Sequence, residues 1–194
     1  MVLNLNYRRL ETLTYRSARL AFLEAQKRSS NENIYTFAIY TSDLYRYFLP
    51  YYNTEEALKK TGEFYINKYP SRYNDVEEII KQIRWNCADW EYQEDYENFF
   101  DEINQILRNV PEQLNKLDEI EFNFTCQVLN DIIITVLSEL NSTGIFGTNN
   151  QRNSIVITIA EDDPDKSSQL EIVKKLNPPE VYKRFKKELE FLWN

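Results

Sequence analysis

Apolar side chains recur every three or four residues in two long segments of the chain, the spacing of a buried helix face. The first segment covers residues 5–28, and most of its arginines and lysines fall outside the apolar stripe. The second covers residues 117–141, and its stripe consists of Leu117, Ile120, Phe124, Val128, Ile132, Val136 and Leu140. Gly144 follows as a natural end of that helix. We therefore predict two long helices that bury these stripes.

Aromatic and apolar residues alternate with their neighbours over residues 34–40 and again over residues 44–52, which is typical of β-strands. A turn signal, Thr41-Ser-Asp43, separates the two segments. The pattern predicts a hairpin over residues 34–52, in which Pro50 either ends the second strand or places it at a sheet edge.

Two later segments also carry strand signals. Residues 154–160 form a short apolar run typical of a buried strand. Residues 83–92, which contain Trp85 and Trp90, are predicted to form a strand or an extended segment.

Capping patterns mark shorter helices. Asn53-Thr-Glu-Glu56 matches an Asn-x-x-Glu capping box and predicts a helix from Thr54 to about Lys68. A second box, Asn177-Pro-Pro-Glu180, opens the last helix with proline at its first position. Other short helices are predicted over residues 75–82, 95–109 and 167–175.

The order of these elements is helix, hairpin, helices, strand, helices. Strands and helices do not alternate regularly, which argues against a doubly wound parallel sheet. We predict one α+β domain over residues 1–194, with a small, mainly antiparallel sheet packed with several helices. The sheet would contain the N-terminal hairpin and one or two later strands.

The composition excludes several classes of chemistry. The chain contains no histidine, which rules out Ser-His-Asp and Cys-His catalytic sites and histidine-bound zinc. It has two cysteines, Cys87 and Cys126, too few for a four-thiolate zinc site. We expect them to be thiols in a reducing compartment, and we expect no cofactor. No apolar run approaches the roughly 18 residues of a membrane helix, and no export signal is evident, so we expect a cytoplasmic protein without membrane contact.

Negative charge is concentrated in the middle of the chain. The whole chain has a net charge of −8, whereas residues 89–150 hold 13 carboxylates and two cations, a net charge of −11. The candidate partner-binding residues at the start of this stretch are Asp89, Trp90, Glu91, Glu94, Asp95, Glu97, Asp101 and Glu102. They either face the basic N-terminal helix of the same molecule or attract a basic protein partner. Nucleic acid is disfavoured as a ligand, because phosphate binding requires a basic surface.

A second carboxylate cluster follows the predicted strand at residues 154–160. Carboxylates at a strand end can bind Mg²⁺ or Ca²⁺, although the glycine-containing pattern of an EF-hand is absent. The alternative is a solvated loop. The candidate metal ligands are Glu161, Asp162, Asp163 and Asp165.

Several aromatic and turn positions resemble a family of known sequences. They are Tyr35-Thr-Phe-Ala-Ile-Tyr-Thr-Ser-Asp43, Arg84-Trp85, Asp89-Trp90-Glu-Tyr92, Leu176-Asn-Pro178 and Val181-Tyr-Lys-Arg-Phe185. In these positions the chain resembles the bacterial domain-of-unknown-function family 4303 over nearly its whole length. The resemblance implies a compact single-domain protein without an assigned activity. Some members resemble small proteins encoded beside toxins, which implies a possible role as an immunity protein.

Three functions follow as hypotheses. The first is a non-enzymatic protein-binding domain, such as an immunity protein that neutralises a basic toxin or nuclease through an acidic surface. The second is an enzyme that uses a divalent metal bound near residues 161–165. The third is a structural or regulatory protein.

Overall fold

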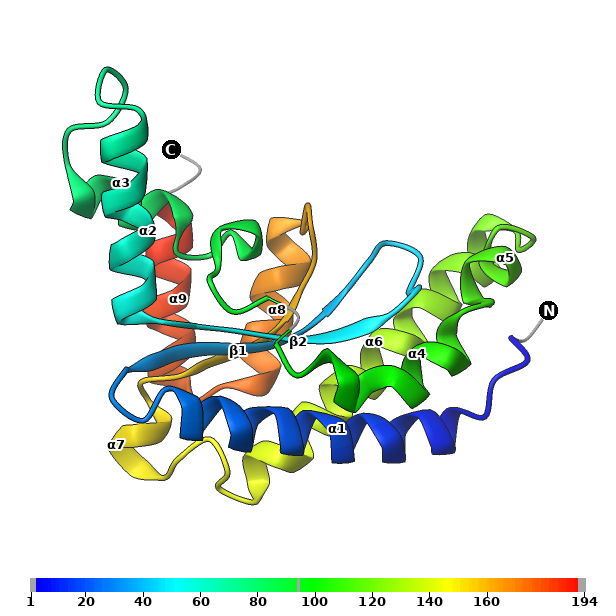
Figure 1. Ribbon diagram of the computed structural model, residues 1–194. Helices are drawn as coiled ribbons and strands as arrows, with labels where there is room; N and C mark the ends of the chain where they lie inside the picture. Colours follow the sequence, from blue (N-terminus) through cyan, green and yellow to red (C-terminus); the bar gives the residue numbers. More distant parts are fainter. Residues whose placement is uncertain (1–2, 94, 192–194) are drawn as a thin grey trace.

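The computed structural model describes residues 3–93 and 95–191 (Figure 1). Its helices and strands follow in the order α1 Tyr7–Arg28, β1 Ile34–Thr41, β2 Phe48–Thr54, α2 Glu55–Lys68, α3 Val76–Ile83, η1 Cys87–Asp89, η2 Glu97–Phe100, α4 Asp101–Leu107, α5 Val110–Leu114, α6 Glu119–Ser142, α7 Asn149–Arg152, β3 Val156–Ala160, α8 Lys166–Leu176 and α9 Pro179–Phe191. The α+β prediction and most of the predicted elements are confirmed.

The three strands form one sheet in the order β2-β1-β3. Strands β1 and β2 pair antiparallel, as the predicted hairpin requires, with Pro50 opposite Ile39. Because β2 lies at the edge, the missing N–H of Pro50 is tolerated. Strand β3 pairs parallel to β1, with Ile157 opposite Phe37. A parallel partner requires a long crossover, and here the helices from α2 to α7 provide it.

Helices cover both faces of the sheet, so the domain has three layers (Figure 1). On one face Phe37, Ile39 and Ile157 belong to a hydrophobic core that includes buried residues of α1 and α6. On the other face Val156 packs in a second cluster with residues of α2, α3, α8 and α9, including Phe185. All five residues are buried, so the packing of helices against both faces of the sheet stabilises the fold.

Only half of the apolar stripe predicted for α6 is buried. Ile132, Val136 and Leu140 are buried, but Ile120 is 82% exposed and Phe124 is 67% exposed. The prediction that these two side chains are buried is wrong. Figure 1 shows the reason, since the first half of α6 extends toward α5, away from the sheet and from α2 and α3.

Helix α6 is also the one helix among the described residues that is long and apolar enough to cross a membrane by length and composition. The core helix of a globular protein meets the same criterion. The buried side chains of its second half contribute to the domain core, which accounts for its apolar character.

The segment predicted as a strand over residues 83–92 is a tight turn, and that prediction is wrong. Ile83 ends α3, and the 3-10 turn η1 follows. Asn86 caps this turn by accepting a hydrogen bond from the N–H of Ala88, and the indole of Trp90 donates to the Arg84 carbonyl at 2.9 Å. Tyr92 forms an isolated bridge with Tyr52.

Both predicted capping boxes assign the helix cap to the wrong residue. Thr54, not Asn53, caps α2 by accepting a hydrogen bond from Ala57 N–H. Asn53 instead donates to the Tyr35 hydroxyl in the core. Asn177 likewise turns away from α9 and bonds to β3, as described below. In both cases the asparagine side chain forms hydrogen bonds inside the fold, although the local sequence pattern predicted that it caps a helix.

Candidate functional site

The predicted partner-binding residues lie in the segment from η1 to the first turn of α4, and two of them are engaged inside the molecule. Asp89 accepts hydrogen bonds from the Tyr65 hydroxyl at 2.6 Å and from Asn86 Nδ2 at 2.7 Å. Trp90 is 4% exposed. Neither side chain is therefore available as an anchor for a partner. Glu94 lies outside the described residues.

Two further candidates face the basic helix α1. Arg28 pairs with Asp95 at 2.9 Å, and Arg9 pairs with Glu102 at 2.6 Å. Part of the negative charge thus faces the molecule's own N-terminal helix, which was one of the two interpretations of this segment.

The remaining three candidates are open to solvent. Glu91, Glu97 and Asp101 are exposed, and within the described residues no lysine or arginine forms an ion pair with them. Their carboxylates are accessible to molecules outside the domain.

Exposed apolar side chains lie in the same acidic region. We define the acidic arm as residues 95–131, which comprise η2, α4, α5 and the first half of α6 and hold nine carboxylates and two cations, a net charge of −7. Ile120 and Phe124 lie four residues apart, so they are neighbours on one face of α6. The sequence places them next to Asp118, Glu119 and Glu121. The arm therefore presents an apolar pair within a negatively charged surface.

Some of the positions on which the family resemblance rests contact one another, namely Tyr35, Arg84, Trp85, Trp90 and Phe185. The Tyr35 hydroxyl and the Trp90 indole donate to the same carbonyl, that of Arg84, each at 2.9 Å. The Arg84 guanidinium lies over the Tyr35 ring at 4.7 Å and forms two hydrogen bonds with Glu55. Trp85 packs against Phe185 of α9 with ring centroids 4.7 Å apart.

Residues 15–178 match the family described as Domain of unknown function (DUF4303). The chain belongs to the DUF4303 family. No curated protein and no solved structure matches the sequence.

The late motif of the DUF4303 domain, Leu176-Asn-Pro178, contributes to a buried polar centre that the sequence alone did not indicate. The Asn177 amide donates to the Ile157 carbonyl at 2.7 Å and accepts from the Ile157 N–H at 2.8 Å, so it pairs with β3 like another strand. Arg152 is 6% exposed and donates to Asn177 Oδ1, to Asn141 Oδ1 and to the Ile155 carbonyl. We call Arg152, Asn141 and Asn177 the arginine hub.

The arginine hub stabilises a cation without a carboxylate. Burial and the nearby Arg184 lower the pKa of Arg152 to about 10, so it stays charged at neutral pH. Carbonyl and amide oxygens surround it instead, and the Leu176 carbonyl accepts from Nη2 at 3.1 Å. This arrangement satisfies buried donors and leaves no group free for catalysis, so its role is structural.

The four predicted metal ligands occupy two different places: one of them caps a helix, and the other three line a pocket. Asp165 caps α8 by accepting from Ser168 N–H at 2.9 Å. Glu161, Asp162 and Asp163 line a pocket of 560 Å³ together with Glu78. Within residues 3–93 and 95–191 no group of three carboxylates or thiols is placed to hold a metal ion.

The two cysteines are free thiols, and Cys87 is buried. Its Sγ donates to the Glu161 carbonyl at 3.3 Å. Burial, with a smaller contribution from Asp162, raises the pKa of the Cys87 thiol to about 11, so it is protonated at neutral pH. A thiol in this state is a poor nucleophile.

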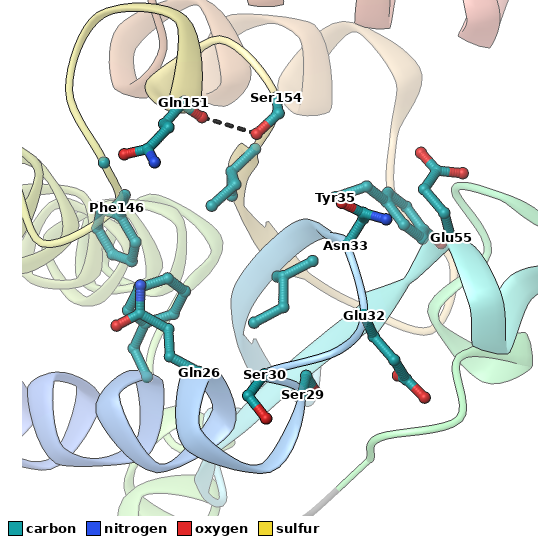
Figure 2. Close-up of a pocket in the computed structure, with 14 residues that line it drawn as sticks. Gln26, Ser29, Ser30, Glu32, Asn33, Tyr35, Glu55, Phe146, Gln151 and Ser154 are labelled. Atoms are coloured by element: carbon teal, nitrogen blue, oxygen red, sulfur yellow. Dashed lines mark hydrogen bonds between the residues drawn. The ribbon is translucent and has the colours of Figure 1, made fainter.

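A separate pocket of 440 Å³ opens between the end of α1 and the start of β3 (Figure 2). Its two carboxylates are already engaged, because Glu32 accepts from the Thr54 and Tyr92 hydroxyls and Glu55 binds Arg84. The other labelled polar side chains, including Gln26 and Gln151, are amides and hydroxyls without a general base beside them. Both carboxylates of this pocket thus take part in contacts within the fold.

Proposed function

We propose that this DUF4303 domain is a non-enzymatic, cytoplasmic protein-binding domain whose acidic arm binds a basic protein. An immunity protein that neutralises a basic toxin or nuclease is the form of this function that we favour. The observation that carries the proposal is the exposure of Ile120 and Phe124 within a segment of net charge −7.

The apolar pair supports a protein partner over a small molecule. An isoleucine and a phenylalanine exposed on adjacent helix turns cost solubility unless another surface covers them. Aromatic side chains in such positions often supply most of the binding energy of an interface. The pair lies on a convex helix face, which suits an apolar hollow in another protein.

The surrounding charge indicates the partner's chemistry. Glu97, Asp101 and Glu119 are exposed carboxylates of the same arm. A negative rim accelerates association with a positively charged surface and disfavours acidic partners and nucleic acid. The metal-dependent enzyme has no comparable observation in its favour.

The test is binding to the proteins encoded by the genes on either side of this one. The purified chain is titrated with each product by calorimetry at low and at high salt. We expect one of them to bind, with a dissociation constant that rises with salt. The variant Phe124→Ala should weaken binding by about 2 kcal/mol, or roughly thirtyfold.

The matched control is Phe64→Ala, because Phe64 is a second exposed phenylalanine, 54% exposed, on α2 outside the arm. It should bind like the unchanged chain. The double reversal Glu97→Lys with Asp101→Lys should slow association and reduce its salt dependence. Failure of every neighbouring product to bind, or equal losses for Phe124→Ala and Phe64→Ala, would contradict the proposal.

A further inference from the structure

The pocket at the carboxyl end of β3 has an unusual charge. We call it the carboxylate pocket; its 560 Å³ are lined by Glu78, Gln82, Trp85, Asn86, Cys87, Glu161, Asp162, Asp163, Pro164, Gln169 and Leu189. Four of these residues are carboxylates and none is a lysine or arginine. The fold brings these carboxylates together from two distant places in the sequence, the first turn of α3 and the loop after β3.

The four carboxylates have no cation of their own. Within the described part of the chain no lysine or arginine forms an ion pair with Glu78, Glu161, Asp162 or Asp163. Burial, with Asp43 as a second cause, raises the pKa of Glu161. Its ionised form is therefore under-stabilised in the free protein, and a cation in the pocket would relieve that cost.

A buried amide in the same pocket gives an independent indication of a ligand. Gln169, on α8, is 9% exposed and lines the pocket. Its backbone N–H bonds to Asp165, but no hydrogen bond engages its side-chain amide among the described residues. Its amide is not among the described polar atoms that are shut off from solvent without a partner, so a molecule in the pocket can reach it. The Gln169 carbonyl oxygen is thus free to accept a hydrogen bond from a molecule in the pocket.

The lining fits an organic cation better than a metal ion. A metal would need three or more of these side chains within direct coordination distance of one point, and no such group exists in the described residues. A guanidinium group is larger, has five N–H donors and can reach several separated carboxylates at once. Trp85, Pro164 and Leu189 add an apolar wall suited to the methylene stem of an arginine.

We propose that the carboxylate pocket binds a guanidinium group, presented as the arginine side chain of a protein or peptide. Asp162, Asp163 and Gln169 accept its hydrogen bonds, and the apolar wall contacts its methylene stem. This pocket uses none of the residues of the acidic arm, so it does not rest on the function proposed above.

The probe is Nα-acetyl-arginine amide, which carries the side chain of a protein arginine without charged ends. The full chain is titrated with it by calorimetry at low salt, and with the uncharged isostere Nα-acetyl-citrulline amide as the reference. We expect saturable binding of the arginine probe and none of the citrulline probe. The absence of saturable arginine binding, or equal binding of both probes, would overturn the proposal.

Variants locate the site. The double variant Asp162→Asn with Asp163→Asn should weaken arginine binding by at least about tenfold, or about 1.4 kcal/mol. Gln169→Leu, which preserves volume in a buried position, should weaken it by a smaller factor. Glu171→Gln is the matched control, because Glu171 is an exposed carboxylate on α8 outside the pocket. Equal affinity in the double variant and the control would overturn the proposed site.

Two further measurements complete the test. The first distinguishes a protein arginine from free arginine as the ligand, and the second distinguishes this proposal from the one for the acidic arm. Free arginine has the same net charge as the capped probe, but its α-ammonium and α-carboxylate must lose water on binding, so it should bind more weakly than the capped probe if a protein side chain is the ligand. Equal or tighter binding of free arginine would support the guanidinium site and assign it to a small molecule. Phe124→Ala should leave arginine binding unchanged. The proposal for the acidic arm and the proposal for the carboxylate pocket can therefore be contradicted independently of each other.

Discussion

The acidic arm and the arginine hub differ in how far their side chains are buried and paired within the chain. In the hub the buried Arg152 donates to the side chains of Asn141 and Asn177 and to backbone carbonyls, and Asn177 also bonds to Ile157. In the arm two large apolar side chains are exposed and the carboxylates of Glu97 and Asp101 lack ion pairs with the described residues. The hub is complete within the chain, whereas the arm is left open, which is the expected difference between a structural centre and a binding surface.

The largest expected effect comes from the hub. Replacing Arg152 by methionine removes donors from several buried oxygens, and we expect the free energy of unfolding to fall by about 3 kcal/mol. Urea unfolding followed by circular dichroism measures this change. Arg108→Met is the control, because Arg108 is exposed beside α4 and its loss should change stability by less than about 0.5 kcal/mol. Equal losses would remove the distinction between hub and arm.

The two halves of α6 give a comparison within one helix. Leu137 is fully buried, so Leu137→Ala should lower the free energy of unfolding by about 3 kcal/mol. Phe124→Ala should change it by less than about 0.5 kcal/mol, because its ring is mostly exposed. The same unfolding experiment tests both variants. A loss for Phe124→Ala as large as that for Leu137→Ala would show that the ring is buried in solution.

The smallest effect is expected where the arm meets α1. Arg9 and Glu102 are both more than half exposed, so Arg9→Met should lower the free energy of unfolding by at most about 0.5 kcal/mol. Salt screens such pairs, so the difference between variant and unchanged chain should disappear at high ionic strength. A loss that persists in high salt would mean that α1 holds the arm by packing rather than by charge.

The sequence predicted the elements of the sheet and the long helices because their signals are local. Alternation gave the hairpin of β1 and β2, and three-to-four spacing gave α1 and α6. The same spacing failed for Ile120 and Phe124, because whether a helix stripe is buried depends on how far its neighbours extend. The strand prediction for residues 83–92 failed for a related reason. Hydrogen bonds of Asn86 and Trp90 stabilise a turn there, although the aromatic pattern favours a strand.

The sites were predictable in part. The concentration of charge in the middle of the chain pointed to the arm, and the carboxylates after β3 pointed to one wall of the pocket. The other wall was not visible, because Glu78 and Trp85 lie more than 70 residues earlier in the chain. The hub was missed as well, because Arg152 meets Asn177 only after β3 and α8 have folded between them.

The most direct test of the account is hydrogen–deuterium exchange of the full chain with and without the neighbouring gene product that binds it. We expect slower exchange in the first half of α6 and in α4 when the partner is present, because the acidic arm becomes covered. The exchange of residues around Arg152 and Asn177 should stay unchanged. Unaltered exchange in the arm, together with protection at another surface, would contradict the claim that the arm is the binding site.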